Sequence, residues 1–480
     1  MGTTSALDVF GEATRAWFEA AFAAPTPAQE GAWAAIAAGH NALVVAPTGS
    51  GKTLSAFLWS LDRLATSPVP EKKARCRVLY VSPLKALAVD VERNLRAPLT
   101  GIRHTAARLG LPEPDLTVGV RSGDTTAQDR RRIMTTPPDI LITTPESLFL
   151  MLTSQAREVL RSVDTVILDE VHAVAGTKRG AHLALSLERL DALLPQPAQR
   201  IGLSATVRPI EEVARFLGGD KPVEVVAPPS TKEWDLRVVV PVEDMSELGQ
   251  LTDHVEGSAA GAQRSSIWPH VEEQVVDLIE QHRSTIVFAN SRRLAERLTA
   301  RFNEIATERA GEVVDRDGEP PAQLMAQSGA SFGAGPVIAR AHHGSVSKEQ
   351  RALIEDDLKR GVLPCVVATS SLELGIDMGA VDLVVQIESP PSVASALQRV
   401  GRAGHQVGEI SRGVLLPKHR ADLVHTTVAV ERMRIGAIES LRVPTNPLDV
   451  LAQQIVAATA VDQWDVDAFY ELVRRTASFS

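Results

Sequence analysis

The sequence predicts an α/β protein in which two parallel β-sheets are each covered by helices. Short runs of β-branched residues alternate with helical stretches throughout the 480 residues, as in units built from parallel strands. In the first half these runs are 42–45, 77–81, 116–120, 139–143, 165–169 and 200–204. A second series occupies 284–290, 336–342, 364–370 and 382–387, so we expect a second α/β unit.

The boundary between the two units is expected where proline and polar residues interrupt the pattern, at 227–235. We therefore predict a first domain over 1–228 and a second over 229–438. The remaining residues, 439–480, are predicted to form two helices and are too few for a separate well-packed domain. We expect them to be the start of a third, incomplete domain.

The composition argues against several classes of protein. The net charge is -9 and aromatic residues make up 4%, so neither a general basic coat nor extensive base stacking is expected. A local basic channel remains compatible with this charge. Cys76 and Cys365 lack CxxC partners, which disfavours disulfides and zinc and fits a reducing cytoplasm. No signal peptide or membrane span is expected.

The segment APTGSGKT (46–53) follows an apolar strand and opens a helix, which is typical of a phosphate-binding loop. Gly49 and Gly51 would let the backbone approach the phosphates closely. Lys52 would neutralise phosphate charge, and the Thr53 hydroxyl would ligate Mg²⁺. A chance glycine turn is disfavoured, because strand and helix are both in place. The residues expected to bind the nucleotide here are Thr48, Gly49, Ser50, Gly51, Lys52 and Thr53.

The segment VILDEVH (166–172) provides the acidic groups of an NTPase. Its apolar strand would deliver two carboxylates to the sheet edge where ligands bind in α/β proteins. Asp169 would hold Mg²⁺, mostly through water, and Glu170 would orient and polarise the attacking water. Such a pair alone is usually solvated surface. Together with the phosphate loop, it indicates nucleotide hydrolysis.

The DEVH motif, taken with LSAT (203–206), resembles motifs II and III of superfamily-two helicases. Upstream, PTPAQ (25–29) resembles their adenine-recognition motif. On this resemblance Gln29 would hydrogen-bond the adenine edge, which implies that the nucleotide is ATP. His172, Ser204 and Thr206 would couple the nucleotide state to domain arrangement. The alternative for His172 is a buried, hydrogen-bonded histidine.

The segment LQRVGRAGHQVG (397–408) resembles motif VI of the same helicases. In that family two RecA-like domains close on one ATP, and the second supplies an arginine finger. The resemblance implies Arg402 as the finger and Arg399 as a link to the motif II acid or the phosphates. Many relatives have another arginine where this chain has His405, which leaves the full set of fingers open. A solvated basic turn is the alternative.

The segment VVATSSLELGIDMG (366–379) resembles motif V. On this resemblance Gly375 and Asp377 would contact the ribose side of the nucleotide. Gln398, in motif VI, is predicted to join the coupling residues.

Both units also contain segments that resemble the helicase motifs for the nucleic-acid backbone. These segments are 81–95 and 143–148 in the first unit and 288–298, 342–351 and 369–371 in the second. Hydroxyls, amides and cations position a strand without reading its bases. Each match alone usually means solvated surface, but their order favours a binding track. The residues expected to contact the strand are Pro83, Lys85, Arg93, Thr144, Asn290, Ser291, Arg292, His343, Gly344, Thr369 and Ser370.

As a set, these motifs resemble the Lhr (large helicase-related) family, which is close to the Ski2-like helicases. The resemblance implies ATP and Mg²⁺ as cofactors and 3′-to-5′ translocation on single-stranded DNA. It also implies unwinding of DNA and RNA–DNA duplexes, with DNA repair as the setting. Two RecA-like domains would be followed by a winged helix, whose start would be 439–480.

Two other functions stay open at this point. An RNA helicase or RNP remodeller could use the same motor, because nothing in these motifs reads a 2′-hydroxyl. A non-motor nucleic-acid-binding scaffold could retain the fold. The presence of Lys52, Asp169, Glu170 and Arg402 argues against a scaffold.

Overall fold

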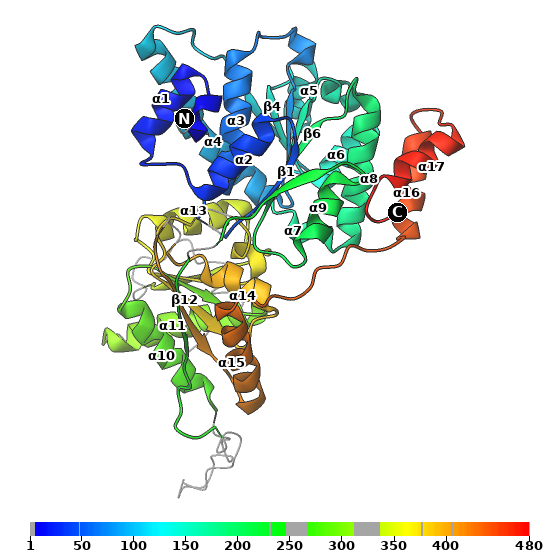
Figure 1. The fold of residues 1–480 in the computed structure, drawn as a ribbon. Coiled ribbons are helices and arrows are strands. Elements are labelled where there is room, and N and C mark those ends of the chain that lie inside the picture. Colours follow the sequence, from blue (N-terminus) through cyan, green and yellow to red (C-terminus); the bar gives the residue numbers. More distant parts are fainter. Residues whose placement is uncertain are drawn as a thin grey trace, which may run out of the picture. The chain divides into compact units, whose positions relative to one another are not determined.

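The computed structural model contains two compact units, each with a parallel sheet covered by helices (Figure 1). The first unit combines Met1–Ser230 with Glu439–Ser480, and the second is Thr231–Ile438. This confirms the predicted fold class. The structure describes residues 5–47, 49–229, 232–245, 266–311, 337–375, 378–404 and 408–479.

The sheet of the first unit has the strand order β3-β4-β2-β5-β6-β1-β7, and every pairing in it is parallel. The strands are β1 (Asn41–Val45), β2 (Val78–Val81), β3 (Val118–Arg121), β4 (Ile140–Thr143), β5 (Thr165–Leu168), β6 (Gln199–Ser204) and β7 (Val223–Val226). Successive side chains of β1 alternate between two apolar clusters: Leu43 and Val45 join one, and Ala42 and Val44 join the other. Both faces of the sheet are therefore buried, as expected for parallel strands.

Helices α1 to α4 pack on one face of this sheet, and α5 to α9 pack on the other (Figure 1). Their bounds are α1 (Glu12–Ala21), α2 (Pro27–Ala37), α3 (Lys52–Thr66), α4 (Lys85–Leu109), α5 (Ala127–Thr135), α6 (Pro145–Leu152), α7 (His172–Ala175), α8 (Lys178–Leu193) and α9 (Ile210–Gly218). Short 3₁₀ helices cover Ala6–Val9, Lys72–Ala74 and Gln155–Leu160.

The C-terminal helices α16 (Leu448–Thr459) and α17 (Val466–Arg474) pack against α8 of the first unit. A buried polar contact lies at the centre of this packing. Arg189 Nη1 donates to Gln454 Oε1 at 2.8 Å, and Gln454 Nε2 donates to Ser186 Oγ at 3.0 Å. The segment after 438 is thus part of the same compact body as the first sheet, although it comes last in the sequence.

The sheet of the second unit has the order β10-β11-β9-β12-β13-β8 and is also parallel. Its strands are β8 (Trp234–Val238), β9 (Thr285–Phe288), β10 (Ala339–His342), β11 (Cys365–Ala368), β12 (Leu383–Ile387) and β13 (Ser411–Leu416). Its helices are α10 (Trp268–Glu280), α11 (Arg292–Arg309), α13 (Lys348–Lys359), α14 (Val393–Val400) and α15 (Arg420–Arg434), with a 3₁₀ turn at Ser370–Leu372. Strand β8 begins at the end of the stretch 227–235, which we predicted to be a break between domains.

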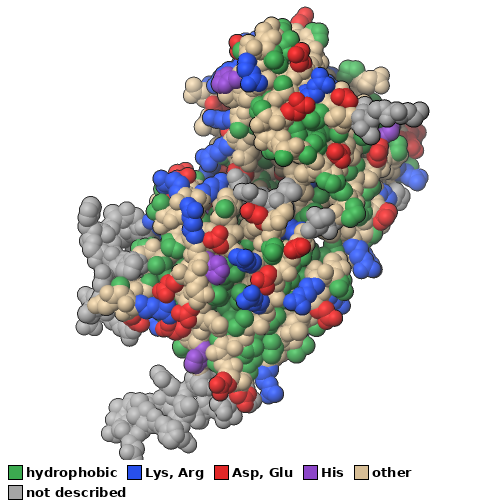
Figure 2. Space-filling view, turned by 60° about the vertical axis from the view of Figure 1, so that its left-hand side comes forward, with side chains coloured by type: hydrophobic (Ala, Val, Ile, Leu, Met, Phe, Trp, Pro, Cys, Tyr) green, Lys and Arg blue, Asp and Glu red, His purple; other side chains and the backbone are tan. Residues whose placement is uncertain are grey.

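Both cysteines are buried and free, and burial raises the pKa of the Cys76 thiol to about 12. Of the helices that the structure describes, none is long and apolar enough to cross a membrane. Acidic and basic side chains are interspersed over the face shown in Figure 2.

Candidate nucleotide site and nucleic-acid interface

The phosphate loop connects the buried strand β1 to helix α3. Gly49 and Gly51 adopt φ angles of 81° and 78°, in the left-handed region that favours glycine. Lys52 Nζ donates to the carbonyl oxygens of Ala46 at 2.5 Å and Pro47 at 2.8 Å, so the ammonium lies over the turn of the loop. Because α3 begins at Lys52, the helix N-terminus and the lysine bring positive potential to one place.

Gln29, at the start of α2, contacts this loop through its side chain. It forms a capping box with Thr26 at the start of α2: the Thr26 N–H donates to Gln29 Oε1 at 2.9 Å. Its Nε2 lies 3.4 Å from the Gly51 carbonyl oxygen, and Thr26 Oγ1 donates to the Ser50 carbonyl oxygen at 2.9 Å. A Cβ on Gly51 would come within 2.5 Å of Gln29 Nε2. Gln29 therefore supports the phosphate loop here, and its contact with adenine stays a prediction.

The strand register brings the predicted motifs of the first unit to one edge of the sheet. Leu168 at the end of β5 pairs with Val81 of β2 and Gly202 of β6, and Val81 pairs in turn with Thr143 of β4. The carboxyl ends of parallel strands form the ligand-binding edge of such sheets. The phosphate loop, the acidic pair and the segments after β2, β4 and β6 all begin at this edge.

The two acidic residues lie side by side at the end of β5. Burial, and then the charge of Glu170, raise the pKa of Asp169 to about 7, whereas the nearby Tyr80 hydroxyl and the charge of Lys52 act in the opposite direction. Tyr80 is fully buried and its ring stacks on Phe57. Glu170 adopts φ 43°, a backbone conformation that is uncommon without glycine and is found at functional sites.

The site suits a divalent cation because two carboxylates repel each other there. Asp169 and the exposed Thr53 hydroxyl are the oxygen ligands that Mg²⁺ prefers. Within the described ranges, no group of three or more His, Cys, Asp and Glu residues could hold a metal by itself.

His172 links the acidic pair to the segment after β6. Its Nδ1 accepts the Ala205 N–H at 3.2 Å and lies 3.3 Å from Ser204 Oγ and 3.5 Å from Glu170 Oε2. An imidazole nitrogen that accepts a backbone N–H carries no proton, so the ring proton is on Nε2. The geometry joins three of the residues predicted for coupling or catalysis. Thr206 is exposed one residue beyond.

The two predicted arginines of the second unit converge on Glu373, which the sequence analysis did not single out. Arg399 Nε and Nη2 donate to Glu373 Oε2 at 3.1 and 3.0 Å, and its Nη1 donates to Asn290 and Gln386. Arg402 Nη2 donates to the Glu373 carbonyl oxygen at 3.0 Å. Both guanidinium groups are nearly fully buried, so neither belongs to a solvated basic turn.

For several other predicted site residues the structure gives only the exposure, or nothing. Gly375 is exposed and Gln398 is partly buried. Thr48, Asp377 and His405 lie outside the described residues.

The predicted nucleic-acid residues of the first unit occupy the same sheet edge as the acids. Pro83 is buried just after β2, and Lys85 and Arg93 are exposed on α4. Lys85 pairs with Asp124 at 2.6 Å. Thr144 is buried and caps α6 by accepting the Ser147 N–H at 3.4 Å.

The corresponding residues of the second unit follow β9, β10 and β11. Asn290, Ser291, Arg292, Gly344 and Ser370 are exposed, Thr369 is partly buried, and His343 is buried. Ser291 caps α11 by accepting the Leu294 N–H at 3.2 Å. His343 differs from the others because both of its ring nitrogens already have partners, Glu296 and the Ser345 N–H.

Three family models match consecutive parts of the chain. They are the DEAD/DEAH box helicase over 26–214, the helicase conserved C-terminal domain over 322–406, and the winged helix domain of large helicase-related protein over 431–480. A solved structure of the Mycobacterium smegmatis helicase Lhr bound to ssDNA and AMP-PNP matches with a TM-score of 0.86 and 64% identity, over 99% of this chain and 56% of that one.

The chain belongs to the Lhr helicase family. The Lhr helicase/probable uracil glycosylase of Mycolicibacterium smegmatis is 65% identical over 100% of this chain and 31% of that protein. The Lhr-Core ATP-dependent helicase of Methanothermobacter thermautotrophicus is 41% identical over 96% of this chain and 50% of that protein. The chain thus spans 31% and 50% of the length of these two relatives, and the predicted resemblance is confirmed.

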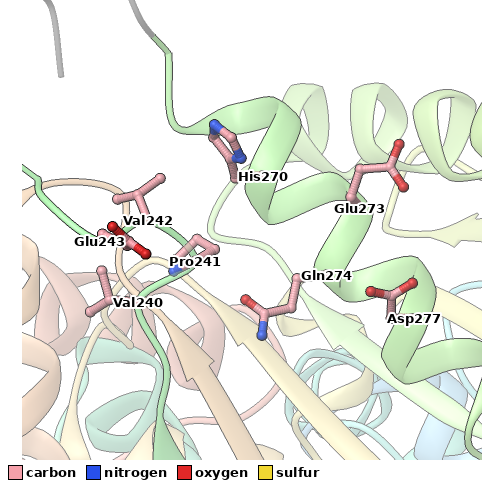
Figure 3. Close-up of a pocket in the computed structure, with 8 residues that line it drawn as sticks. All are labelled: Val240, Pro241, Val242, Glu243, His270, Glu273, Gln274 and Asp277. Carbon is pink, nitrogen blue, oxygen red and sulfur yellow. The ribbon is translucent and has the colours of Figure 1, made fainter. Parts of the chain in front are cut away.

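A separate groove of this Lhr chain lies in the second unit, between the segment after β8 and helix α10 (Figure 3). Its volume is about 480 Å³. It is lined by Val240, Pro241, Val242, Glu243, His270, Glu273, Gln274 and Asp277. None of these lining residues was predicted as a site residue. The groove lies beside β8, at the opposite end of the sheet from β10.

Sequence reasoning missed the residues that hold the site residues in place. Glu373 and Glu296 lie within the segments 366–379 and 288–298, which resemble helicase motifs, but the resemblance assigned them no role. Tyr80 lies within a predicted strand. The capping role of Gln29 did have a signal: a Thr followed three residues later by Gln, with Pro at the first helical position, indicates a helix start.

Proposed function

We propose that this chain is the motor of an ATP-dependent DNA helicase, which moves along single-stranded DNA as it hydrolyses ATP. The main support is the single sheet edge where the phosphate loop, the Asp169–Glu170 pair and the His172–Ala205 contact begin. The solved relative of 64% identity holds ssDNA and AMP-PNP, which supports the same two ligands for this chain.

The proposed hydrolysis uses groups at this edge and two arginines of the second unit. Backbone N–H groups of residues 49–53 and the Lys52 ammonium bind the β- and γ-phosphates. Glu170 orients and polarises the water that attacks the γ-phosphate. Arg402 stabilises the charge on the transferred phosphoryl group, and Arg399 holds the surrounding loops through Glu373 and Asn290. Thr53 and Asp169 would hold Mg²⁺, which when bound neutralises phosphate oxygens.

Coupling runs through His172. Its Nδ1 accepts the Ala205 N–H, and Glu170 Oε2 lies 3.5 Å from the same nitrogen. A shift of Glu170 would therefore move the ring and change its hydrogen bond to the backbone. We propose that this bond transmits the state of the nucleotide to the segment after β6. The predicted backbone contacts, Lys85 and Arg93 in the first unit and Asn290 to Arg292 in the second, hold the strand without reading bases.

We further propose 3′-to-5′ translocation, unwinding of DNA and RNA–DNA duplexes, and a role in DNA repair, as the family resemblance implies. The two buried, free cysteines support a reducing compartment, the cytoplasm.

Strand displacement on 3′-tailed and 5′-tailed duplexes tests this proposal, with each tail made of DNA or RNA. We expect ATP-dependent displacement from 3′ DNA tails, with little from 5′ tails or RNA tails. Displacement from RNA tails alone would identify an RNA helicase instead. Strand binding without ATP hydrolysis would identify a non-motor scaffold.

A further inference from the structure

Three strands of the second unit end at the same level, which places three loops side by side. His342 of β10 pairs with Ala368 of β11, and Ala368 pairs with Phe288 of β9. The next residues of each strand are therefore neighbours at the carboxyl edge. These residues include most of the predicted nucleic-acid contacts of the second unit.

Two adjacent histidines at the end of β10 contact different segments, and each histidine pairs with a different glutamate. His342 Nε2 lies 3.0 Å from Glu355 of α13, and its Nδ1 lies 2.9 Å from Ser371 Oγ after β11. His343 Nε2 lies 2.5 Å from Glu296 of α11, which follows β9. The side chains of His342 and His343 are 0% and 5% exposed, so neither ring presents an open face to a strand.

The hydrogen bonds of His343 determine where its proton lies. Nδ1 accepts the Ser345 backbone N–H at 3.2 Å, so it has no proton of its own. Nε2 therefore carries the proton and donates it to Glu296. Glu296 thus orients the ring, and the ring in turn orients the backbone two residues further along.

The oriented turn presents a cation. Arg292 Nη1 donates to Ser345 Oγ at 2.9 Å, and both residues are exposed. A guanidinium has five N–H donors, and one bond to Ser345 fixes its direction while other donors remain for a phosphate. Gly344 lies beside this guanidinium: a Cβ there would be in ordinary contact with Arg292 Nη2, at 3.4 Å.

We propose that Glu296 is a positioning residue for nucleic-acid binding: through His343 it holds the 343–345 turn so that Arg292 and Ser345 face a phosphodiester group. This inference rests on the proposed function and assigns His343 an indirect role in place of the predicted direct contact. Glu296 itself is a carboxylate and would repel a phosphate, so its effect on binding must act through the imidazole.

Substitutions at Glu296 test this with binding of a labelled single-stranded DNA oligonucleotide and the DNA dependence of ATP hydrolysis. Glu296→Ala should weaken oligonucleotide binding about tenfold, although it removes a negative charge. The kcat at saturating DNA should stay within about twofold. Glu296→Gln keeps an acceptor for Nε2–H and should bind nearly as well as the unmodified protein. The slope of log affinity against log salt should fall by about 0.7 in Glu296→Ala, as for one lost phosphate contact.

Glu304→Ala is the matched control, because it removes the same charge from the same helix. Glu304 pairs with Arg301, which also lies within 3.4 Å of Glu272. Binding by this variant should be unchanged or slightly tighter. Equal binding by Glu296→Ala and the unmodified protein, or an equal loss in Glu304→Ala, would overturn the inference.

His343 provides a second test that does not depend on the Glu296 variants being folded. His343→Asn can still accept the Ser345 N–H, because asparagine accepts from the backbone two residues on. It should retain most of the affinity that His343→Ala loses. An equal loss in both variants would contradict the role given to the hydrogen bond from the Ser345 N–H. If the unmodified protein neither bound DNA nor hydrolysed ATP faster with it, the proposed function would fail first.

Discussion

Charged residues lie at the carboxyl edges of both sheets, but their electrostatic surroundings differ. In the first unit, Asp169 and Glu170 repel each other, and the pKa of Asp169 is raised to about 7. In the second unit, Arg399 lies against Glu373, and His343 lies against Glu296. The first edge has charges that a ligand would compensate, whereas the second has charges that the fold already compensates.

This difference separates two kinds of group: those that bind a ligand and those that hold a loop in place. Charged groups that bind a phosphate or a cation repel one another in the ligand-free protein, and the ligand relieves this repulsion. Such unfavourable arrangements recur at functional sites. Groups that must orient a loop or a guanidinium are instead held rigidly by buried ion pairs. The predictions below test each side of this comparison, in decreasing order of expected effect.

Lys52→Ala should reduce ATP hydrolysis to background, because it removes the positive charge that lies over the phosphate loop. The measurement is phosphate release with saturating single-stranded DNA. Lys73→Ala is the control, because Lys73 is exposed in a 3₁₀ turn outside the site. Near-normal ATP turnover in Lys52→Ala would contradict the assignment of residues 46–53 as a phosphate-binding loop.

Arg402→Ala should lower kcat on the order of 10³-fold with little change in ATP affinity, as expected for a residue that acts on the transition state. Single-turnover hydrolysis and binding of an ATP analogue separate the two effects. A loss of affinity equal to the loss of rate would instead assign Arg402 to ground-state binding.

Glu373→Ala should destabilise the second unit by about 3 kcal/mol, because it leaves the buried Arg399 guanidinium without its carboxylate. Hydrogen exchange of the β9 and β12 amides reports on this unit separately. The exposed Glu431→Ala should change the same amides by less than about 0.5 kcal/mol. Similar changes in both variants would argue that the Arg399–Glu373 pair is not what holds these loops.

Asp169→Asn should abolish hydrolysis yet raise the thermal midpoint of the ligand-free protein by a few degrees. The folded state holds the Asp169 proton up to pH about 7, whereas an unfolded aspartate loses it near pH about 4. The stability contributed by this proton therefore falls as the pH rises between these values. The advantage of Asp169→Asn should be larger at pH 8 than at pH 5, and a constant difference would contradict the raised pKa.

The sequence was most informative where a chemical function requires a fixed local pattern. Gly49, Gly51 and Lys52 could be assigned because a strand, a glycine turn and a helix follow one another in a short segment. The core strands could be predicted because parallel strands buried on both faces are continuous apolar runs. Strand β8 was missed because prolines and polar residues at 227–233 precede it and suggested a break between domains. The alternation of apolar and polar residues in Trp234–Val238 was itself a strand signal.

The partners of the site residues could not be predicted, because they come from distant parts of the chain. Glu373 reaches Arg399 across 26 positions, and Glu296 reaches His343 across 47. An isolated glutamate on a helix is usually solvated, so no local pattern distinguishes Glu296 from Glu304. The register of β9, β10 and β11 is needed to show that Glu296, and not Glu304, lies beside the end of β10.

The most direct test of the motor is the rate of ATP hydrolysis measured with and without single-stranded DNA, using the chain as it stands. If the two edges work as one motor, added DNA should raise kcat at least tenfold, and Lys52→Ala should abolish both rates. A rate that is the same with and without DNA, in a protein that still binds the strand, would contradict the account.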